Sequence, residues 1–233
     1  MPDNKVPIKT SSAEIDQFLT TVSQIPAVST NSKGRLLFAM DATASRQPTW
    51  DRACQLQGDM FTQTRGLGGL DVQLCFYRGY DEFRVSPWHN NAERLLKAML
   101  TVSCLGGRTQ IQRVLQHAID EHKRTKVQAL VFVGDCIEES IDELCQLAGE
   151  LGLLGVPVFL FQEGNDINAL RGFKQMARLS RGAHCHFDTD SSQQLGELLN
   201  AVAVYASGGV KALQNLGGCS EAVKRLSNQL GSY

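Results

Sequence analysis

A short apolar stretch over residues 36–40 ends abruptly at three side chains that carry oxygen: Asp41, Thr43 and Ser45. Such a run entering small and polar residues is typical of a buried strand that delivers its last side chains to the end of a sheet. A carboxylate with two hydroxyls can hold a hard cation, because Mg²⁺ and Mn²⁺ prefer oxygen ligands whereas zinc favours nitrogen and sulfur. The pattern therefore indicates metal-binding chemistry.

Two later segments supply further oxygens. Thr109 closes a glycine loop, Gly106-Gly107-Arg108-Thr109, that opens a helix, and Asp135 follows the continuous apolar stretch 127–133. Few of these side chains need to touch the ion, since waters can fill other positions and leave one open. An acidic side chain from a partner could complete such a site without any turnover. The candidate ligands for Mg²⁺ (or Mn²⁺) are Asp41, Thr43, Ser45, Thr109 and Asp135.

Strand and helix patterns alternate between these residues. Strands are predicted over 36–40, 71–77, 127–133, 156–161 and 183–187, with a polar edge strand over 82–86 after the turn Arg78-Gly79-Tyr80-Asp81. Helical spacing of apolar residues predicts helices over 48–63, 91–103, 110–122, 141–151, 167–176 and 193–206. This alternation predicts an α/β fold with a mostly parallel six-stranded sheet, one antiparallel edge strand and helices on both faces.

The expected topology brings the oxygen-bearing segments to one edge of the sheet. In open α/β sheets, ligands bind at the carboxyl ends of the parallel strands. Asp41 stands at that edge, and strand 127–133 carries Asp135 to it. The antiparallel edge strand leads away and helix 91–103 returns, so that Thr109 arrives there as well. We therefore expect three segments that are distant in sequence to share one site.

Composition bounds the partners. The chain has 233 residues, of which 42% are apolar and 20% charged, enough for a sizeable core. A net charge of −1 provides no basic footprint for nucleic acid or for anionic lipid. The longest apolar stretch, residues 152–161, is too short to cross a bilayer, and residues 1–10 lack the apolar region of a signal peptide. The seven scattered cysteines suggest buried, reduced thiols, so we predict a cytoplasmic protein.

The pattern divides the chain into three parts. Residues 1–34 contain a predicted amphipathic helix at 11–22 and a polar linker, residues 35–207 form the main domain, and residues 208–233 form a helical extension.

The oxygen-bearing motifs resemble the metal-ion-dependent adhesion site (MIDAS) of von Willebrand factor type A (VWA) domains. Asp41-x-Thr43-x-Ser45 is similar to the D-x-S-x-S motif of that family, with threonine in place of the first serine. The loop that ends at Thr109 is similar to the glycine-threonine loop, and Asp135 to the second aspartate, although Cys136 follows it where the family usually has glycine. The resemblance implies a Rossmann-like sheet, a divalent metal, and non-enzymatic binding of a partner protein that presents an acidic residue. It also implies that the last helix of the domain, residues 193–206, can shift when the site is occupied.

Four residues are expected around this site as a partner-binding rim: Arg46, Arg78, Tyr80 and Arg108. Arginines there could draw an acidic partner surface toward the metal. The plainer interpretation is a solvated edge with no partner.

Other functions stay open at this stage. A metal-dependent phosphohydrolase of the haloacid-dehalogenase type also begins with an aspartate after its first strand, but that family resembles D-x-D-x-T and this chain has Thr43 in the place of the second aspartate. A structural or assembly VWA protein without a metal is a further alternative. Asp41 and Asp135 could also be solvated or cap helices, and Thr109 could be the N-cap of the helix that follows it.

Three minor alternatives concern other residues. Gly106-Gly107 lacks the flanking pattern of a nucleotide-binding loop. His184 and His186 share one face of a strand and could bind zinc with Cys219, although a packed pair is commoner. Cys136 could be a nucleophile if a cation lowered the pKa of its thiol, but no histidine base is placed beside it.

Overall fold

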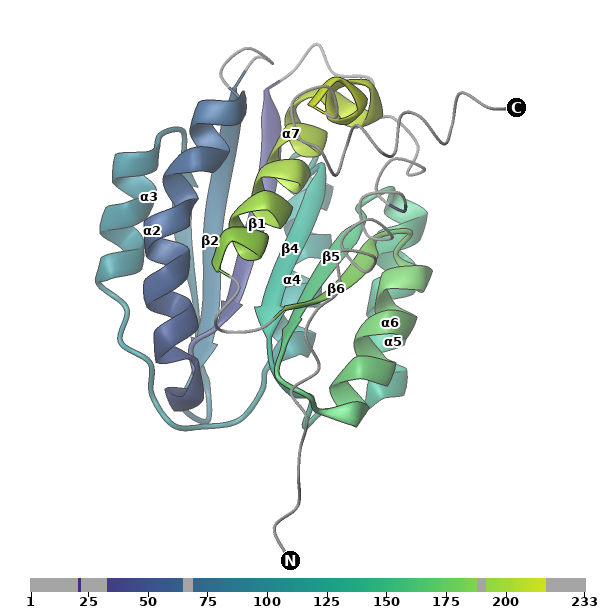
Figure 1. The fold of residues 1–233 in the computed structure, drawn as a ribbon. Helices are drawn as coiled ribbons and strands as arrows, with labels where there is room; N and C mark the ends of the chain where they lie inside the picture. The colour runs from purple at the N-terminus through teal and green to yellow at the C-terminus, as the bar shows by residue number, and fades with distance from the viewer. Residues whose placement is uncertain (1–20, 22–32, 65–68, 188–191, 217–233) are drawn as a thin grey trace, which may run out of the picture.

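The computed structural model of the chain describes residue 21 and residues 33–64, 69–187 and 192–216. Six strands form one sheet in the order β3-β2-β1-β4-β5-β6 (Figure 1). They are β1 (Gly34–Asp41), β2 (Leu70–Arg78), β3 (Glu82–His89), β4 (Ala129–Gly134), β5 (Val158–Glu163) and β6 (Ala183–Phe187). The β2–β3 pair is antiparallel and the other pairs are parallel, which confirms the predicted fold class.

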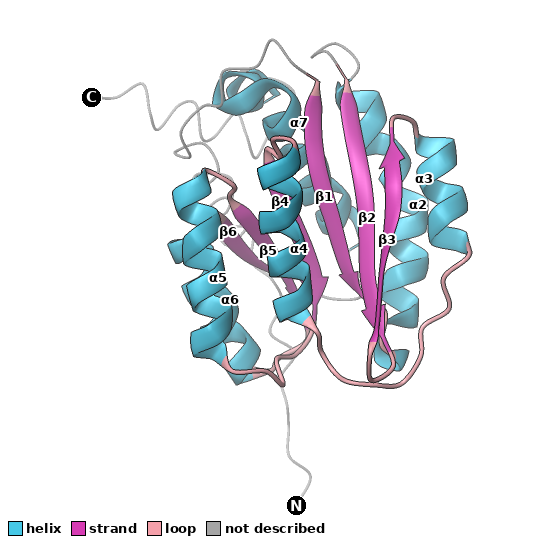
Figure 2. Cartoon of the chain, turned by 180° about the vertical axis from the view of Figure 1, so that it is seen from behind, coloured by secondary structure: helices cyan, strands magenta, loops and turns pink. Residues whose placement is uncertain are grey.

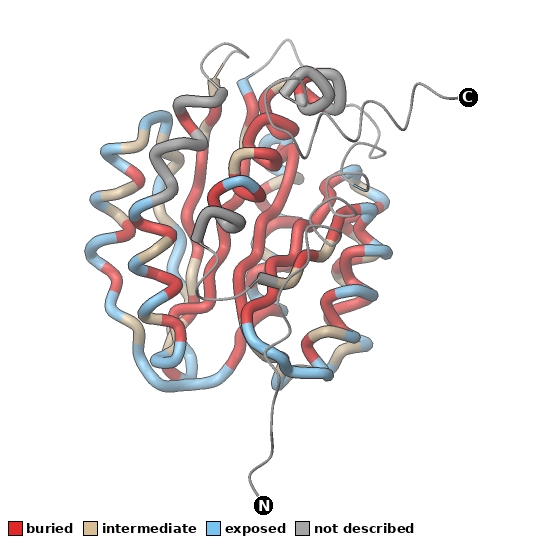
Figure 3. The backbone as a smooth tube through the Cα atoms, viewed as in Figure 1, coloured by how far each residue is buried: buried red, intermediate tan, exposed pale blue. Residues whose placement is uncertain are grey.

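Helices cover both faces of the sheet (Figures 1 and 2). The first face carries α2 (Gln47–Thr64), α3 (Ala92–Leu100) and α7 (Ser192–Leu216), and the second carries α4 (Ile111–Arg124), α5 (Ile141–Leu154) and α6 (Ile167–Leu179). Two apolar clusters fill the spaces between sheet and helices, so β1, β4 and β5 are buried almost throughout, whereas the edge strand β3 is half-buried or exposed (Figure 3). Continuous apolar strands are what a parallel sheet covered on both faces requires.

The alternation of side chains along the central strand β1 determines which face of the sheet Asp41 is on. Leu36, Phe38 and Met40 face the cluster under α2, α3 and α7, whereas Leu37 and Ala39 face the cluster under α4, α5 and α6. Successive side chains of a strand point to opposite faces. Asp41 therefore follows Leu37 and Ala39 toward the α4 side.

Several boundaries differ from the sequence expectation. Strand β3 continues to His89 through Pro87, because an edge strand need not donate every backbone N–H to a neighbour. Helix α3 begins at Ala92 and is capped by Asn91, whose side chain accepts the backbone N–H of Arg94 at 2.9 Å, and it ends at Leu100 rather than at residue 103. Strand β5 begins at Val158 and reaches Glu163, two residues beyond the predicted end.

The predicted terminal elements lie largely outside the described residues. This applies to the helix over 11–22, apart from residue 21, and to the chain beyond residue 216. Helix α7 passes the predicted end at residue 206 and continues to Leu216, with a kink at Gly209, where φ is +66°. Among the helices that the structure describes, each is too short or too polar to cross a membrane.

Candidate metal site

Four of the five predicted ligands form a continuous chain of contacts at the carboxyl edge of β1 and β4, the lower edge in Figure 1. One carboxylate oxygen of Asp41, Oδ1, accepts the backbone N–H of Thr43 at 2.7 Å. The hydroxyl oxygens of Thr43 and Ser45 are 3.5 Å apart, and the Ser45 hydroxyl donates to Asp135 Oδ2 at 3.2 Å. The predicted convergence of the β1 and β4 loops is therefore present.

The second oxygen of each aspartate is buried without a hydrogen-bond partner. These atoms are Asp41 Oδ2 and Asp135 Oδ1. Burial raises the pKa of Asp41, the negative charge of Asp135 raises it further, and the Thr43 hydrogen bonds and Arg46 act in the opposite direction. A buried carboxylate oxygen without a partner is costly, since it has lost its water and gained nothing in return. A divalent cation prefers oxygen ligands of this kind and would supply the positive charge that they lack, so these residues fit the implied metal.

Thr109 is buried and tied to the loop that carries Asp135. Its backbone N–H donates to Glu138 Oε2 at 2.8 Å, and its hydroxyl oxygen accepts the backbone N–H of Glu138 at 3.0 Å. A hydroxyl oxygen has two lone pairs, so one is still available for a cation or a water. Its role as a ligand stays a prediction.

The start of α4 is capped from a neighbouring loop. The carboxylate of Glu139 accepts the backbone N–H groups of Ile111 and Gln112, each at 2.8 Å. The N-cap position is Gln110, whose side chain makes no capping bond, so the interpretation of Thr109 as the N-cap is wrong. Sequence analysis missed Glu138 and Glu139, although their place in the short loop between Asp135 and α5 was a usable signal.

Arg46 was expected on the rim, and the structure corrects this placement. The short helix η1 (Ala44–Arg46) turns its side chain inward, where only 3% is exposed and it forms an ion pair with Glu163 at the end of β5. Glu163 also accepts the hydroxyl of Thr49. One guanidinium nitrogen, Arg46 Nη1, lies 4.0 Å from Asp135 Oδ2. The long side chain of Arg46 can fold inward because Glu163 neutralises it there.

Tyr77 is a second residue that sequence analysis missed. It pairs with Asp41 in the β1–β2 register, and its buried hydroxyl lies near enough to the Asp41 carboxylate for the two to interact, although it makes no hydrogen bond of good geometry within the described residues. Burial raises the pKa of Tyr77 well above its usual value, and the nearby charge of Asp41 adds to this rise. A neutral phenol beside Asp41 is therefore part of the site's wall. Residues paired across two parallel strands point to the same face of the sheet, which could have indicated that Tyr77 lies beside Asp41.

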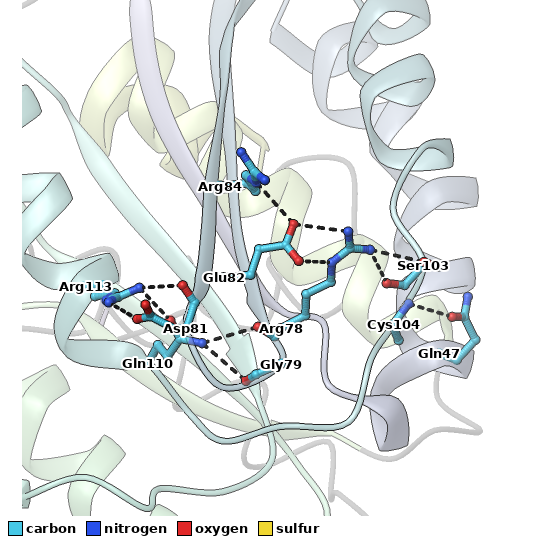
Figure 4. A network of polar contacts seen from close by, with 10 residues as sticks. All are labelled: Gln47, Arg78, Gly79, Asp81, Glu82, Arg84, Ser103, Cys104, Gln110 and Arg113. Atoms are coloured by element: carbon cyan, nitrogen blue, oxygen red, sulfur yellow. Dashed lines mark hydrogen bonds and ion pairs between the residues drawn. The ribbon is translucent and has the colours of Figure 1, made fainter.

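The other rim residues divide into two kinds. Arg78 is held by both carboxylate oxygens of Glu82, at 2.9 and 3.1 Å, and donates to the backbone oxygen and the hydroxyl of Ser103 (Figure 4). Its role is therefore to fix the β2–β3 turn. Tyr80 is 75% exposed, and the exposed Arg108 lies over its ring at 5.9 Å. These two residues face solvent, as a rim requires.

Backbone hydrogen bonds join the three loops of this edge. Leu105 N–H donates to Ala42 O at 3.0 Å, Gly79 N–H to Leu105 O at 3.3 Å, and Arg108 N–H to Gly79 O at 3.1 Å. Gly107 packs directly on Gly79, because a Cβ at residue 107 would stand 1.9 Å from Gly79 O. The glycine loop is thus needed for close approach of two backbones.

The alternative zinc and nucleophile sites gain no support. His184 and His186 contact Gln162 Oε1 at 3.1 Å and Gly164 O at 2.6 Å, and burial lowers the pKa of His184 to about 4. In the described part of the chain, His, Cys, Asp and Glu side chains form no group of three that could hold a metal, and Cys219 lies outside it. Burial and the charge of Asp135 raise the pKa of Cys136 to about 12 in the metal-free protein, which disfavours the thiolate there.

Comparison with known proteins rests on structure. No protein-family model matches the chain, and no curated protein matches it in sequence. The fold is similar to the VWA domain of SpRpn10, with a TM-score of 0.56 and 16% identity over 72% of this chain and 95% of that one. It is also similar to an aerotolerance-related membrane protein from Bacteroides fragilis, with a TM-score of 0.55 and 15% identity over 73% and 98% of the two chains.

A third similar structure carries a metal. Proximal thread matrix protein 1 from the mussel byssus, with a zinc-occupied MIDAS motif, matches with a TM-score of 0.60 and 15% identity, over 74% of this chain and 46% of that one. The class defined by sheet order and helix layers is a Rossmann-like α/β domain. Within that class, the chain has the fold of a VWA domain.

Proposed function

We propose that this VWA-like domain is a non-enzymatic protein-binding module that docks an Asp or Glu of a partner through Mg²⁺ (or Mn²⁺). The observation that carries the proposal is the pair of buried carboxylate oxygens without hydrogen-bond partners, Asp41 Oδ2 and Asp135 Oδ1. When bound, the cation would supply the positive charge that these oxygens lack and would attract a partner's carboxylate. The metal-occupied MIDAS of a protein with a similar fold adds support for a divalent ion.

The chain's own residues have distinct tasks in this proposal. Thr43 fixes the Asp41 carboxylate through its backbone N–H, and Asp135 orients the Ser45 hydroxyl. Thr43, Ser45 and Thr109 contribute neutral oxygens, so the ion would keep much of its charge for an acidic partner. Arg46 lies near Asp135, but its pairing with Glu163 limits its competition with a cation.

The first experiment is a titration of Mg²⁺ and Mn²⁺ into chelator-treated protein, followed by calorimetry and thermal unfolding. We expect heat and a rise in melting temperature for the wild type, and neither for Asp41→Ala. At a Mg²⁺ concentration of about one hundred times the Kd, the stabilisation should be about 2.7 kcal/mol. Asp120→Ala, at an exposed aspartate of α4, is the matched control and should respond as the wild type does. No response in the wild type would favour the structural alternative without a metal.

The second experiment tests partner binding and turnover. Proteins retained from lysate by the wild type in Mg²⁺ should be released by chelator and absent from an Asp41→Ala column. Phosphatase activity that is abolished by Asp41→Asn would instead favour the haloacid-dehalogenase alternative. Against that alternative, the residue two positions after Asp41 is Thr43, which offers no second carboxylate.

A further inference from the structure

A hollow beside the candidate metal site lies between the β2–β3 turn and the loop before α4. It has a volume of about 700 Å³, and its lining includes Tyr80, Phe83, Arg84 and Leu105. Tyr80 and Leu105 are 75% and 53% exposed. Two large apolar side chains exposed at one hollow form a typical binding feature, because scattered single ones are ordinary but grouped ones mark interaction sites.

The hollow adjoins the metal site through the backbone. Leu105 N–H donates to Ala42 O, and Ala42 stands between Asp41 and Thr43. Arg108, whose guanidinium lies over the Tyr80 ring, directly precedes Thr109. A peptide that reached the candidate cation could therefore reach the hollow with residues a few positions away.

The walls of the hollow are held in place by paired charges (Figure 4). Glu82 is bound by Arg78 and Arg84, and Asp81 by Arg113. Gln110 donates from its side-chain nitrogen to the backbone oxygens of Arg78 and Gly79, at 3.4 Å each. The Arg78–Glu82 pair and the Gln110 bonds lower the ordering cost of binding, since the turn needs little rearrangement, whereas the exposed Asp81–Arg113 pair adds little.

Charge indicates what kind of partner the hollow suits. Both acidic residues in its lining, Asp81 and Glu82, are paired with arginines. Arg84 keeps 68% of its side chain exposed, and Arg108 is also exposed. The lining holds Arg84 together with the acids Asp81 and Glu82, and Arg78, Arg113 and Arg108 stand beside it. Together these four arginines and two acids carry a net charge of +2, which favours an acidic segment with an apolar side chain.

We propose that this hollow is a second subsite that receives an aromatic or large aliphatic side chain of the same partner segment whose acidic residue reaches the metal. The proposal rests on the proposed function and adds a specificity requirement to it. The partner is a peptide segment with one acidic and one apolar anchor at a fixed separation. The double variant Tyr80→Ser/Leu105→Ser removes the apolar subsite while changing only exposed side chains.

The test uses a displayed library of random peptides, selected on the Mg²⁺-loaded wild type and on the double variant. Wild-type selection should enrich peptides with Asp or Glu and an apolar residue at a constant separation, and selection on the double variant should keep only the acid. Fluorescence anisotropy with an enriched peptide should show that the double variant binds it about tenfold more weakly, or more weakly still. Leu153→Ser, at another exposed leucine near the end of α5, is the matched control and should bind as tightly as the wild type.

The outcomes separate the two proposals. Peptides that need Mg²⁺ and an acid but no apolar residue, or that bind the double variant equally well, would contradict the second subsite alone. Binding that is unchanged by chelator and by Asp41→Ala would contradict the proposed function and the two-anchor mode together. A wild-type dimer in sedimentation that the double variant converts to monomer would assign the hollow to a second copy and overturn the proposal.

Discussion

The ends of β4 and β5 are neighbouring regions that carry the same kind of side chain in different surroundings. Glu163 ends β5 with its charge paired to Arg46 and a further bond from Thr49. Asp135 follows β4 with one oxygen bonded to Ser45 and the other buried without a partner. Acids at the carboxyl edge are thus not equivalent. Asp135 shares Arg46 only at 4.0 Å and keeps one oxygen without a hydrogen-bond partner, so it is a candidate for an external cation, whereas Glu163 is not.

Among the variants that test this comparison, removal of Glu163 should cause the largest loss of unfolding free energy. Glu163→Ala removes the nearer acid of the buried Arg46 and leaves only Asp135 at 4.0 Å, and breaking a buried pair from one side costs about 3–5 kcal/mol. Urea denaturation in chelator measures the loss. The control is Glu150→Ala, which breaks an exposed pair with Lys123 and should cost less than about 1 kcal/mol. Equal losses in the two variants would contradict the distinction between the strand ends.

Neutralising Asp41 should raise the unfolding free energy of the metal-free protein, whereas the loss of Glu163 lowers it. The folded pKa of Asp41 is raised, so the folded protein retains a proton that the unfolded chain releases as pH rises past about 4. This contribution to stability is present at low pH and is lost as pH rises through the raised folded pKa. Asp41→Asn should therefore stabilise the chelator-treated protein by about 1–2 kcal/mol at neutral pH, because it removes a buried charge.

The check is urea denaturation of the wild type and Asp41→Asn across this pH range, with and without Mg²⁺. Without Mg²⁺ the gap between the two proteins should widen as pH rises, and saturating Mg²⁺ should stabilise only the wild type. A wild type that gains stability over Asp41→Asn with rising pH in chelator would show that another charge already compensates Asp41.

Loss of the cap on α4 should have a smaller effect. Glu139→Ala removes two bonds to the helix N-terminus, which should cost about 1 kcal/mol of unfolding free energy. Mg²⁺ affinity should fall by a few-fold if Thr109 is a ligand, since residues 109 and 111 share the same short segment. Glu143→Ala, at a residue in the first turn of α5, is a useful control for the loss of an acid. A loss of stability without any change in Mg²⁺ affinity would contradict the prediction that Thr109 is a metal ligand.

The smallest effect is expected at the hollow's outer ion pair. Asp81 and Arg113 have side chains that are 83% and 46% exposed, and exposed pairs contribute little. Asp81→Ala should change the unfolding free energy by about 0.5 kcal/mol or less, as measured by urea denaturation. A loss as large as that of Glu163→Ala would mean that exposure does not separate the two kinds of pair.

The fold was predictable because its signals are local and repeated. Alternating strand and helix periods identified the six strands, and parity along β1 places Asp41 on the α4 side. The meeting of the loops that carry Asp41 and Asp135 follows from parallel strands ending at one edge of the sheet, whereas the individual hydrogen bonds come from the structure.

What sequence reasoning could not provide are contacts whose partners lie far apart in the chain. The inward turn of Arg46 depends on Glu163, more than a hundred residues later. The cap of α4 by Glu139 comes from a loop after the next strand, so a local rule pointed to Thr109 instead. Arg78 was expected in solvent because its bonds to Glu82 and Ser103 depend on how the turn folds back.

The direct packing of Gly107 on Gly79 has a kinetic consequence. Two backbones in such close contact, with hydrogen bonds on either side, leave the loops little freedom to rearrange before an encounter. A partner would then meet a surface already in its bound shape, so its association rate would carry no large penalty for reshaping the loops. Among related partners, affinity should differ chiefly in residence time.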